Sequence, residues 1–241
     1  DEQLRGMVWG SFVADSLALV AHWIYDQKKI IQKFTRVDTL LAPQSDSQHA
    51  GKLAGDFTHY GDQALVLLSS LAARKGFDLH DFASRWREFW THTSSYEDQA
   101  TRKTLANLRE GKEVEDAGSE SNDLAGAARI APLTYLLGSN LQALIRAARD
   151  QTRMTHQDAV VVDSAEFFAR VTNDVLSGKK PVQAMQDAVG HFYAALPAQA
   201  WVESGLEAAK QESAAAIQDL GKTCHAPHAF PGTVQLIARH E

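Results

Sequence analysis

Residues 64–76 read ALVLLSSLAARKG, and this stretch decides the class of the fold. Its apolar side chains recur at spacings of three and four, which is the period of one face of an α-helix. Gly76 follows the last apolar position, where a glycine commonly ends a helix. The same spacing recurs along the chain, and no stretch keeps the strict alternation of a β-strand. We therefore predict an all-α protein.

Outward from this stretch, helical spacing predicts further helices on both sides. Their ranges are 4–23, 78–90, 98–111, 124–137, 140–153, 155–178, 182–196 and 198–220, with a short apolar segment at 234–238. Thr155 and Asp158 are spaced as a capping box for one of them. Residues 27–56 and 221–231 carry Pro and Gly and little amphipathic pattern, so we predict loops there. No repeat or linker interrupts the chain, which predicts one compact domain over residues 1–241.

The composition excludes several classes of partner. There are 24 Lys and Arg against 30 Asp and Glu, a net charge of −6, and no run of cations is longer than three. Binding to nucleic acid needs clustered cations, so we expect no nucleic-acid partner. The apolar run Leu17–Ala21 ends at His22, well short of the roughly 20 residues of a bilayer span, so we expect no membrane partner. The single Cys224 excludes an internal disulfide, and we expect a reducing, cytoplasmic location.

Asp15 interrupts an apolar helical stretch. A carboxylate among apolar neighbours is costly unless a partner, a helix terminus or an ion compensates it. Most buried polar groups are simply hydrogen-bonded, so the favoured interpretation is a structural bond to the terminus of a neighbouring helix.

The segment Gly55–Gln63 is denser in ligand-type side chains than any other part of the chain. It directly precedes the apolar helix, so its carboxylates and backbone N–H groups converge on a helix N-terminus. Asp62 could serve there as an ordinary N-cap. It could also form a metal site if Asp56, Thr58 and Gln63 add oxygen ligands.

Two later segments place polar side chains where they could contact a ligand. Residues 121–123 read SND and precede small residues that allow close approach to the backbone. His156 is predicted at the exposed first turn of a helix, where it could donate to a phosphate or ribose oxygen. Helix capping and an idle surface histidine are the alternatives. Cys224, His225 and His228 fall short of a closed zinc set.

Taken in order, four segments resemble the ADP-ribosylglycohydrolase superfamily, and most of all its J-type lens-crystallin-like branch. The segments are residues 10–26, 55–63, 121–133 and 155–156. The resemblance implies a multi-helix orthogonal bundle. It also implies an activity, because active members hold two magnesium ions and cut the glycosidic bond that joins ADP-ribose to a protein side chain or a related acceptor.

The chain departs from the family pattern at several positions. Where active members read Thr-Asp-Asp-Thr, this chain reads GDQA at 61–64, so only Asp62 carries over as a metal ligand and catalytic residue. His22 stands where a glutamate is expected. The loop that carries Ser121 and Asn122 is two residues longer than in typical hydrolases. The family's last motif, with Asp-x-Asp-Thr, is absent and is expected beyond Glu241.

The resemblance therefore implies a divergent hydrolase of ADP-ribosyl or related nucleotide-ribose substrates. In it Asp62 binds magnesium, His22 or Asp26 replaces a lost ligand, and three residues grip the substrate: Ser121, Asn122 and His156. Because two dications need several anionic ligands, we expect one magnesium ion or none. The expected partner is an ADP-ribose-like molecule or an ADP-ribosylated protein. The alternatives are a non-catalytic, crystallin-like binding or structural protein that keeps the cleft, and a helical scaffold for protein partners.

Overall fold

The computed structural model describes residues 2–241 and contains twelve α-helices and three short 3-10 helices. Within these residues no strand forms, and two isolated bridges pair Ser119 with His156 and Asp123 with His225. The prediction of an all-α fold is confirmed. The α-helices are α1 (Glu2–Ala18), α2 (Gln27–Phe34), α3 (His59–Arg74), α4 (Leu79–His92), α5 (Gln99–Arg109), α6 (Ile130–Leu137), α7 (Leu141–Arg153), α8 (Ala159–Leu176), α9 (Pro181–Val189), α10 (Ala198–Ala208), α11 (Ser213–Leu220) and α12 (Ala226–His240). The 3-10 helices are η1 (Leu19–Ala21), η2 (Val114–Asp116) and η3 (Leu124–Arg129).

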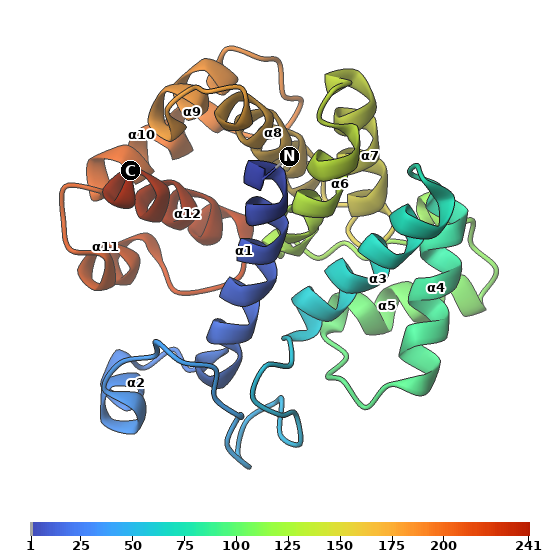
Figure 1. Ribbon diagram of the computed structural model, residues 1–241, viewed down its shortest axis with the longest axis horizontal. Coiled ribbons are helices and arrows are strands. Elements are labelled where there is room, and N and C mark those ends of the chain that lie inside the picture. Colours follow the sequence, from blue (N-terminus) through green and yellow to red (C-terminus); the bar gives the residue numbers. More distant parts are fainter. Residues whose placement is uncertain (1) are drawn as a thin grey trace.

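Helix α1 lies between two groups of helices. Helices α3, α4 and α5 lie on one side of it and α9 to α12 on the other, while α2 and the long loop after it lie at its C-terminal end (Figure 1). The core is continuous across these groups and includes Trp86 of α4, Leu133 of α6, Phe167 of α8 and Phe230 of α12, all fully buried. Each such side chain contributes about 2 to 3 kcal/mol by leaving water.

Several predicted helix starts are confirmed by their caps. The side chains of Asp78, Asp98 and Asn140 accept backbone hydrogen bonds at the starts of α4, α5 and α7. At α8 the predicted capping box was wrong, because Asp158 itself caps the helix by accepting from the N–H groups of Val160 and Val161.

Three other boundaries differ from the prediction. The predicted loop 27–56 begins with α2, an amphipathic helix capped by Asp26. The predicted loop 221–231 ends early, because α12 begins at Ala226 and tolerates a proline in its first turn, where no N–H donor is needed. The predicted helices 182–196 and 198–220 end or break at Val189 and Ala208.

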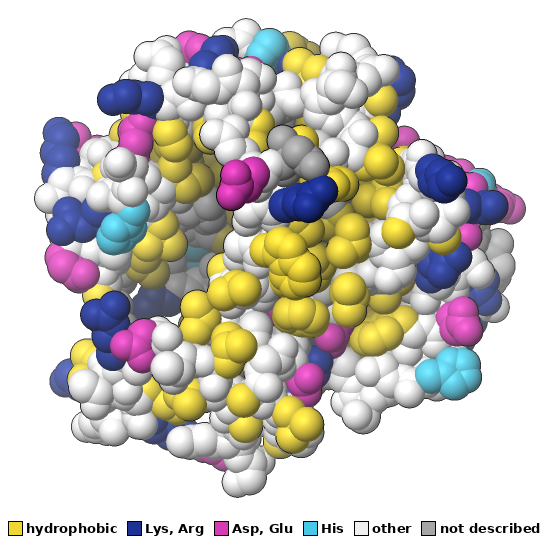
Figure 2. Space-filling view, viewed as in Figure 1, with side chains coloured by type: hydrophobic (Ala, Val, Ile, Leu, Met, Phe, Trp, Pro, Cys, Tyr) yellow, Lys and Arg dark blue, Asp and Glu magenta, His cyan; other side chains and the backbone are white. Residues whose placement is uncertain are grey.

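One segment meets the length of a membrane span. Residues Glu2–Ala21 form a helical stretch of 20 residues that is, by length and composition, apolar enough to cross a bilayer, and it is longer than the run Leu17–Ala21 that the sequence analysis considered. Core helices of soluble proteins and signal sequences also have this length and composition. Figure 2 shows apolar side chains gathered on the face where α1 lies, and Trp9 of α1 is 70% exposed.

Candidate functional site

Asp15 fastens the start of α3 to α1. Its Oδ2 accepts from the backbone N–H of Thr58 at 2.8 Å, and its Oδ1 accepts from Thr58 Oγ1 at 2.6 Å. Thr58 in turn caps α3 by accepting from the N–H of Tyr60. Burial raises the pKa of Asp15, and the bonds from Thr58 oppose that rise. The structural interpretation of Asp15 is confirmed, and the N-cap of α3 is Thr58 rather than Asp62.

Asp62 lies in the first turn of α3 and is bound by a lysine. Its Oδ2 accepts from Lys52 Nζ at 2.5 Å and from Ser95 Oγ at 2.6 Å. Lys52 Nζ also donates to the carbonyl of Phe57 at 2.6 Å. Both charged side chains are largely buried, with 15% and 13% exposed. A lysine ammonium therefore lies next to this carboxylate and compensates its charge.

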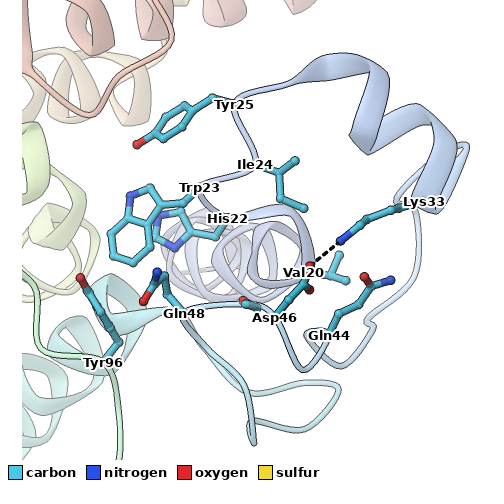
Figure 3. Close-up of a pocket in the computed structure, with 11 residues that line it drawn as sticks. Val20, His22, Trp23, Ile24, Tyr25, Lys33, Gln44, Asp46, Gln48 and Tyr96 are labelled. Carbon is cyan, nitrogen blue, oxygen red and sulfur yellow. Dashed lines mark hydrogen bonds and ion pairs between the residues drawn. The ribbon is translucent and has the colours of Figure 1, made fainter.

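Two cavities lie in this part of the protein, and the ion pair lines the second of them. The first, which we call the aromatic cleft, has a volume of about 370 Å³ and is lined by residues 20, 22–25, 33, 44, 46–48 and 96. Figure 3 shows Trp23, Tyr25 and Tyr96 toward one end of it, and Lys33 with Asp46 toward the other. The second, the polar cavity, has a volume of about 400 Å³ and is lined by residues 48–52, 55–57, 62, 65 and 93–96. Both include Gln48 and Tyr96, so the two cavities are neighbours.

Three histidines lie between these cavities. His22 Nδ1 and His49 Nε2 share a hydrogen bond of 2.7 Å, and His59 Nε2 lies 3.2 Å from Asp98 Oδ2. Burial, followed by the neighbouring His59, lowers the pKa of His22 to about 3 and that of His49 to about 4. Trp23 stacks on His22 with ring centroids 4.3 Å apart.

The remaining predicted ligand residues lie elsewhere. Asp26 is exposed and caps α2. Asn122 Oδ1 accepts a 2.5 Å hydrogen bond from His225 Nδ1, and the Asn122 carbonyl accepts from the N–H of Ala226. These bonds tie this loop to the start of α12. Ser121 Oγ accepts from the N–H of Asp123. These side chains therefore organise helix starts, and only Asp62 and His22 of the predicted set line the two cavities.

His156 is buried, so the prediction of an exposed position was wrong. It is 2% exposed, its Nδ1 is 2.8 Å from Thr155 Oγ1, and its Nε2 has no hydrogen-bond partner. Burial, followed by the charge of Arg129, lowers the pKa of His156 to about 3. The imidazole is therefore neutral at physiological pH and is part of the packing around Arg129.

The comparison with protein families covers the chain from end to end. Residues 1–241 match the family model of the ADP-ribosylglycohydrolases. The chain belongs to the ADP-ribosylglycohydrolase family. Crystallin J1A of Tripedalia cystophora is 22% identical over 260 residues, which cover 100% of this chain and 78% of that relative. An uncharacterized protein of Archaeoglobus fulgidus is 27% identical over 171 residues, which cover 70% of this chain and 54% of that relative.

The fold of the ADP-ribosylglycohydrolase family agrees with a solved structure. A chain described as an ADP-ribosylglycohydrolase-related protein complex has a TM-score of 0.67 and 23% sequence identity. The alignment covers 97% of this chain and 73% of that one. This similarity shows a shared all-α fold.

The sequence did not predict several residues of this candidate site. His49 and Lys52 lie in the segment predicted as an irregular loop, and Tyr96 follows α4 without any motif. His59 stands inside the ligand-rich segment 55–63, where no spacing distinguishes it from its neighbours. The density of polar side chains in that segment is the sequence feature that indicates a site. Contacts between residues that are tens of positions apart leave no local pattern in the sequence.

Proposed function

We propose that this family member binds a nucleotide-ribose ligand of the ADP-ribose class. It does so without magnesium and does not catalyse magnesium-dependent hydrolysis of the ligand. The observation that carries the proposal is the ion pair of Lys52 with Asp62 at 2.5 Å. The ammonium already compensates the carboxylate, and a dication at the same oxygen would lie next to a like charge. The crystallin relatives agree with a protein that has no catalytic task.

The donors around Asp62 do not fit two magnesium ions. Magnesium takes oxygen ligands in octahedral geometry, and a pair of ions needs several carboxylates. At the neighbouring positions the chain has Gly61, Gln63 and Ala64. The amide of Gln63 is already engaged, because its oxygen accepts from Trp86 and Arg129. In the described part of the chain, Asp62 belongs to no cluster of three or more close ligand atoms.

The aromatic cleft supplies groups that suit a nucleotide. Its volume of about 370 Å³ lies within the range of small-molecule sites. Trp23, Tyr25 and Tyr96 offer ring faces on which a base stacks. Lys33 offers a cation to a diphosphate, although it now pairs with Asp46 at 3.2 Å. A ligand that spans the cleft would place its base and its phosphates at opposite ends.

A divergent hydrolase is the second candidate. The observation in its favour is that Asp62 still faces the polar cavity of about 400 Å³, together with Asp56. If Lys52 moved away, these two carboxylates could share one magnesium ion. The two candidates therefore differ in whether magnesium changes ligand binding or turnover.

Calorimetry with ADP-ribose, with and without magnesium, tests the proposal alongside an assay for release of ADP-ribose from an ADP-ribosylated peptide. We expect magnesium-independent binding and no release. The variant Tyr96→Ala should bind about tenfold more weakly through lost stacking, whereas Phe192→Ala, an exposed aromatic at 88%, should bind as the wild type does. Magnesium-dependent release would establish the hydrolase instead, and absence of binding would overturn the assignment of the ligand.

A further inference from the structure

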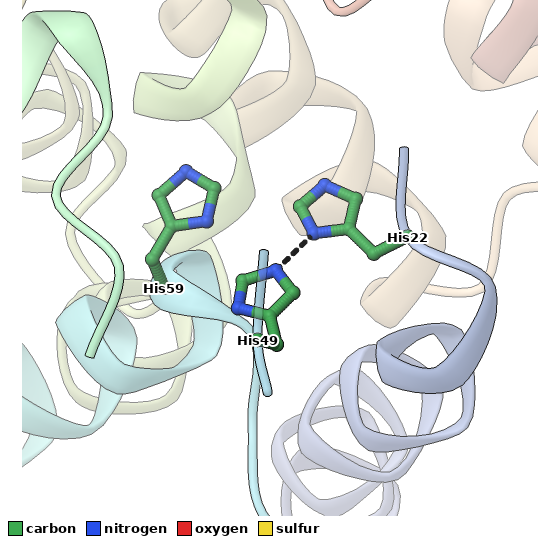
Figure 4. A group of neighbouring side chains, drawn as sticks. All are labelled: His22, His49 and His59. Atoms are coloured by element: carbon green, nitrogen blue, oxygen red, sulfur yellow. Dashed lines mark hydrogen bonds between the residues drawn. The ribbon is translucent and has the colours of Figure 1, made fainter. Parts of the chain in front are cut away.

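Three imidazoles converge at one point between the two cavities. They come from the turn after η1, from the loop before α3 and from the first residue of α3 (Figure 4). One nitrogen of each of His22, His49 and His59 lies within 4.8 Å of the others. Of the described residues, this is the one group of three or more His, Cys, Asp or Glu side chains with ligand atoms that close together.

Two of these rings carry a buried nitrogen without a partner. His49 is 2% exposed and His59 is 0% exposed, yet Nδ1 of each makes no hydrogen bond. Leaving a buried polar atom unpaired costs about 1 to 3 kcal/mol, and native proteins rarely tolerate it without a reason. Figure 4 shows Nδ1 of His59 on the side of its ring that faces the other two histidines. The unpaired Nδ1 of His59 is therefore directed into the cluster.

The other nitrogen of His59 is held by a carboxylate. Asp98 Oδ2 lies 3.2 Å from His59 Nε2, and Asp98 is fixed as the N-cap of α5 by its 2.6 Å bond from the N–H of Thr101. Metal-binding histidines commonly donate their second ring N–H to such a carboxylate, which sets the tautomer and aims the free nitrogen. In the neutral ring that donates from Nε2 to Asp98, Nδ1 of His59 carries the lone pair that a metal needs.

We propose that His22, His49 and His59 form a binding site for a transition-metal dication, with zinc as the first candidate. Imidazole nitrogen suits Zn²⁺, Cu²⁺, Ni²⁺ and Fe²⁺, whereas Mg²⁺ prefers oxygen. The site is therefore chemically distinct from a magnesium centre at Asp62. Its test is separate from that of the nucleotide-ribose ligand, because binding of the metal alone is measured, although His22 also lines the aromatic cleft.

The His22–His49 pair needs only a small adjustment to accept the ion, and the ligand nitrogen of His59 starts within 4.8 Å of both. His22 Nδ1 and His49 Nε2 are 2.7 Å apart, and two nitrogens on a tetrahedral zinc with bonds of about 2.0 to 2.1 Å are separated by roughly 3.3 Å. A shift of less than about 1 Å thus replaces their mutual hydrogen bond with two metal bonds.

Three histidine ligands leave a fourth position, which in zinc sites is taken by water or a small ligand. His22 lines the aromatic cleft, so a small ligand could reach the fourth coordination position of the metal from that cleft. The backbone there is strained: Trp23, directly after His22, has a φ of 63°, which is unusual for a bulky residue.

Cobalt(II) titration of the full chain, after dialysis against a chelator, tests the site through its visible absorption. We expect saturable bands of a four-coordinate ion at one equivalent, which zinc displaces and magnesium does not. Asp98→Asn keeps an N-cap for α5 but removes the charge behind His59, and it should weaken binding about 10- to 100-fold. His49→Gln should weaken it further, and the exposed His191→Gln should bind as the wild type does.

Nitrogen-detected NMR of the wild-type histidine rings keeps the test independent of variant folding. Zinc should shift the ring nitrogens of His22, His49 and His59 and leave His191 unchanged. Binding that is equal in wild type and His49→Gln, or shifts confined to other histidines, would overturn the proposal. So would the absence of cobalt bands in folded wild-type protein.

Discussion

Arg129 donates from Nη1 to the amide oxygen of Gln63 at 2.8 Å, and Trp86 donates from Nε1 to the same oxygen at 2.8 Å. The guanidinium is 1% exposed, and burial lowers the pKa of Arg129 to about 10. Its hydrogen bonds through Nε and Nη2 go to neutral groups on Gln151 and Thr155. Uncharged oxygen atoms thus bind a buried guanidinium, and one of them belongs to Gln63 of α3.

Replacing Gln63 with Ala should lower the free energy of unfolding by about 3 kcal/mol. The reason is that Arg129 and Trp86 would each lose a buried acceptor, and an unpaired buried cation is the costlier of the two. Gln63→Glu should lose less, because it keeps the acceptor and adds a charge for Arg129. Urea denaturation measures both. The exposed Gln211→Ala should change stability by no more than about 0.5 kcal/mol. Equal urea midpoints for Gln63→Ala and wild type would contradict this account of the network.

Replacing Lys52 with Met should make Asp62 available to a divalent ion. Breaking the largely buried pair costs about 2 kcal/mol in the absence of added metal, between the values for exposed and fully buried pairs. Magnesium should then raise the thermal midpoint of Lys52→Met and leave that of wild type unchanged. Lys29→Met, at an exposed position on α2, is the control and should show neither effect. If magnesium stabilised wild type as much as the variant, the lysine would not be what excludes the ion.

The fold was largely predictable because its information is local. Asp78, Asp98 and Asn140 mark helix starts that sequence alone located, since a cap acts on the N–H groups two or three residues away. Helix α12 was missed because its prolines resemble loop residues, although buried Phe230 and Val234 secure it through tertiary packing. Propensity is a weak guide where packing decides.

The site was less predictable because its contacts are distant in sequence. Lys52 pairs with Asp62 ten residues away, and Ser95 reaches the same carboxylate from 33 residues away. His22 and His49 meet across 27 residues, through a loop that has no periodic pattern. The predicted exposure of His156 was also wrong. Its neighbours in sequence are polar, yet its side chain packs in the interior.

Stability should fall as the pH drops below about 6.5, partly because of His156. Its pKa is about 3 in the folded protein against an ordinary value of 6.5, so between these values the unfolded chain binds a proton that the native chain does not. By linkage the stability is full above 6.5 and declines toward pH 3. From pH 7.5 to 5.5 the loss from this group is about 1.4 kcal/mol. Urea denaturation measures the free energy of unfolding at both pH values. Between them, the decrease for His156→Met should be smaller than the decrease for wild type by about 1.4 kcal/mol. His191→Gln, at an exposed position, should keep the wild-type dependence, and an unchanged slope in His156→Met would refute the assignment.

Gly61 and Gly10 should respond in opposite ways to alanine, although both lie inside α-helices. A Cβ at Gly61 would overlap Asp15 Oδ2 and lie 2.7 Å from Phe57 Cβ, whereas one at Gly10 meets nothing within 4 Å. Gly61→Ala should therefore cost about 2 to 3 kcal/mol, and Gly10→Ala should gain up to about 1 kcal/mol from helix propensity.

The cost at Gly61 should depend on Asp15. The new methyl group has to displace that carboxylate, which then gives up its two bonds to Thr58. In Asp15→Ala those bonds are already lost and the space is free, so adding Gly61→Ala should cost at least about 1 kcal/mol less than it does in wild type. Thermal denaturation of the two single variants and the double variant measures this coupling. Strictly additive losses would mean that Phe57, and not the Asp15 contact that fastens α3 to α1, limits the space at this glycine.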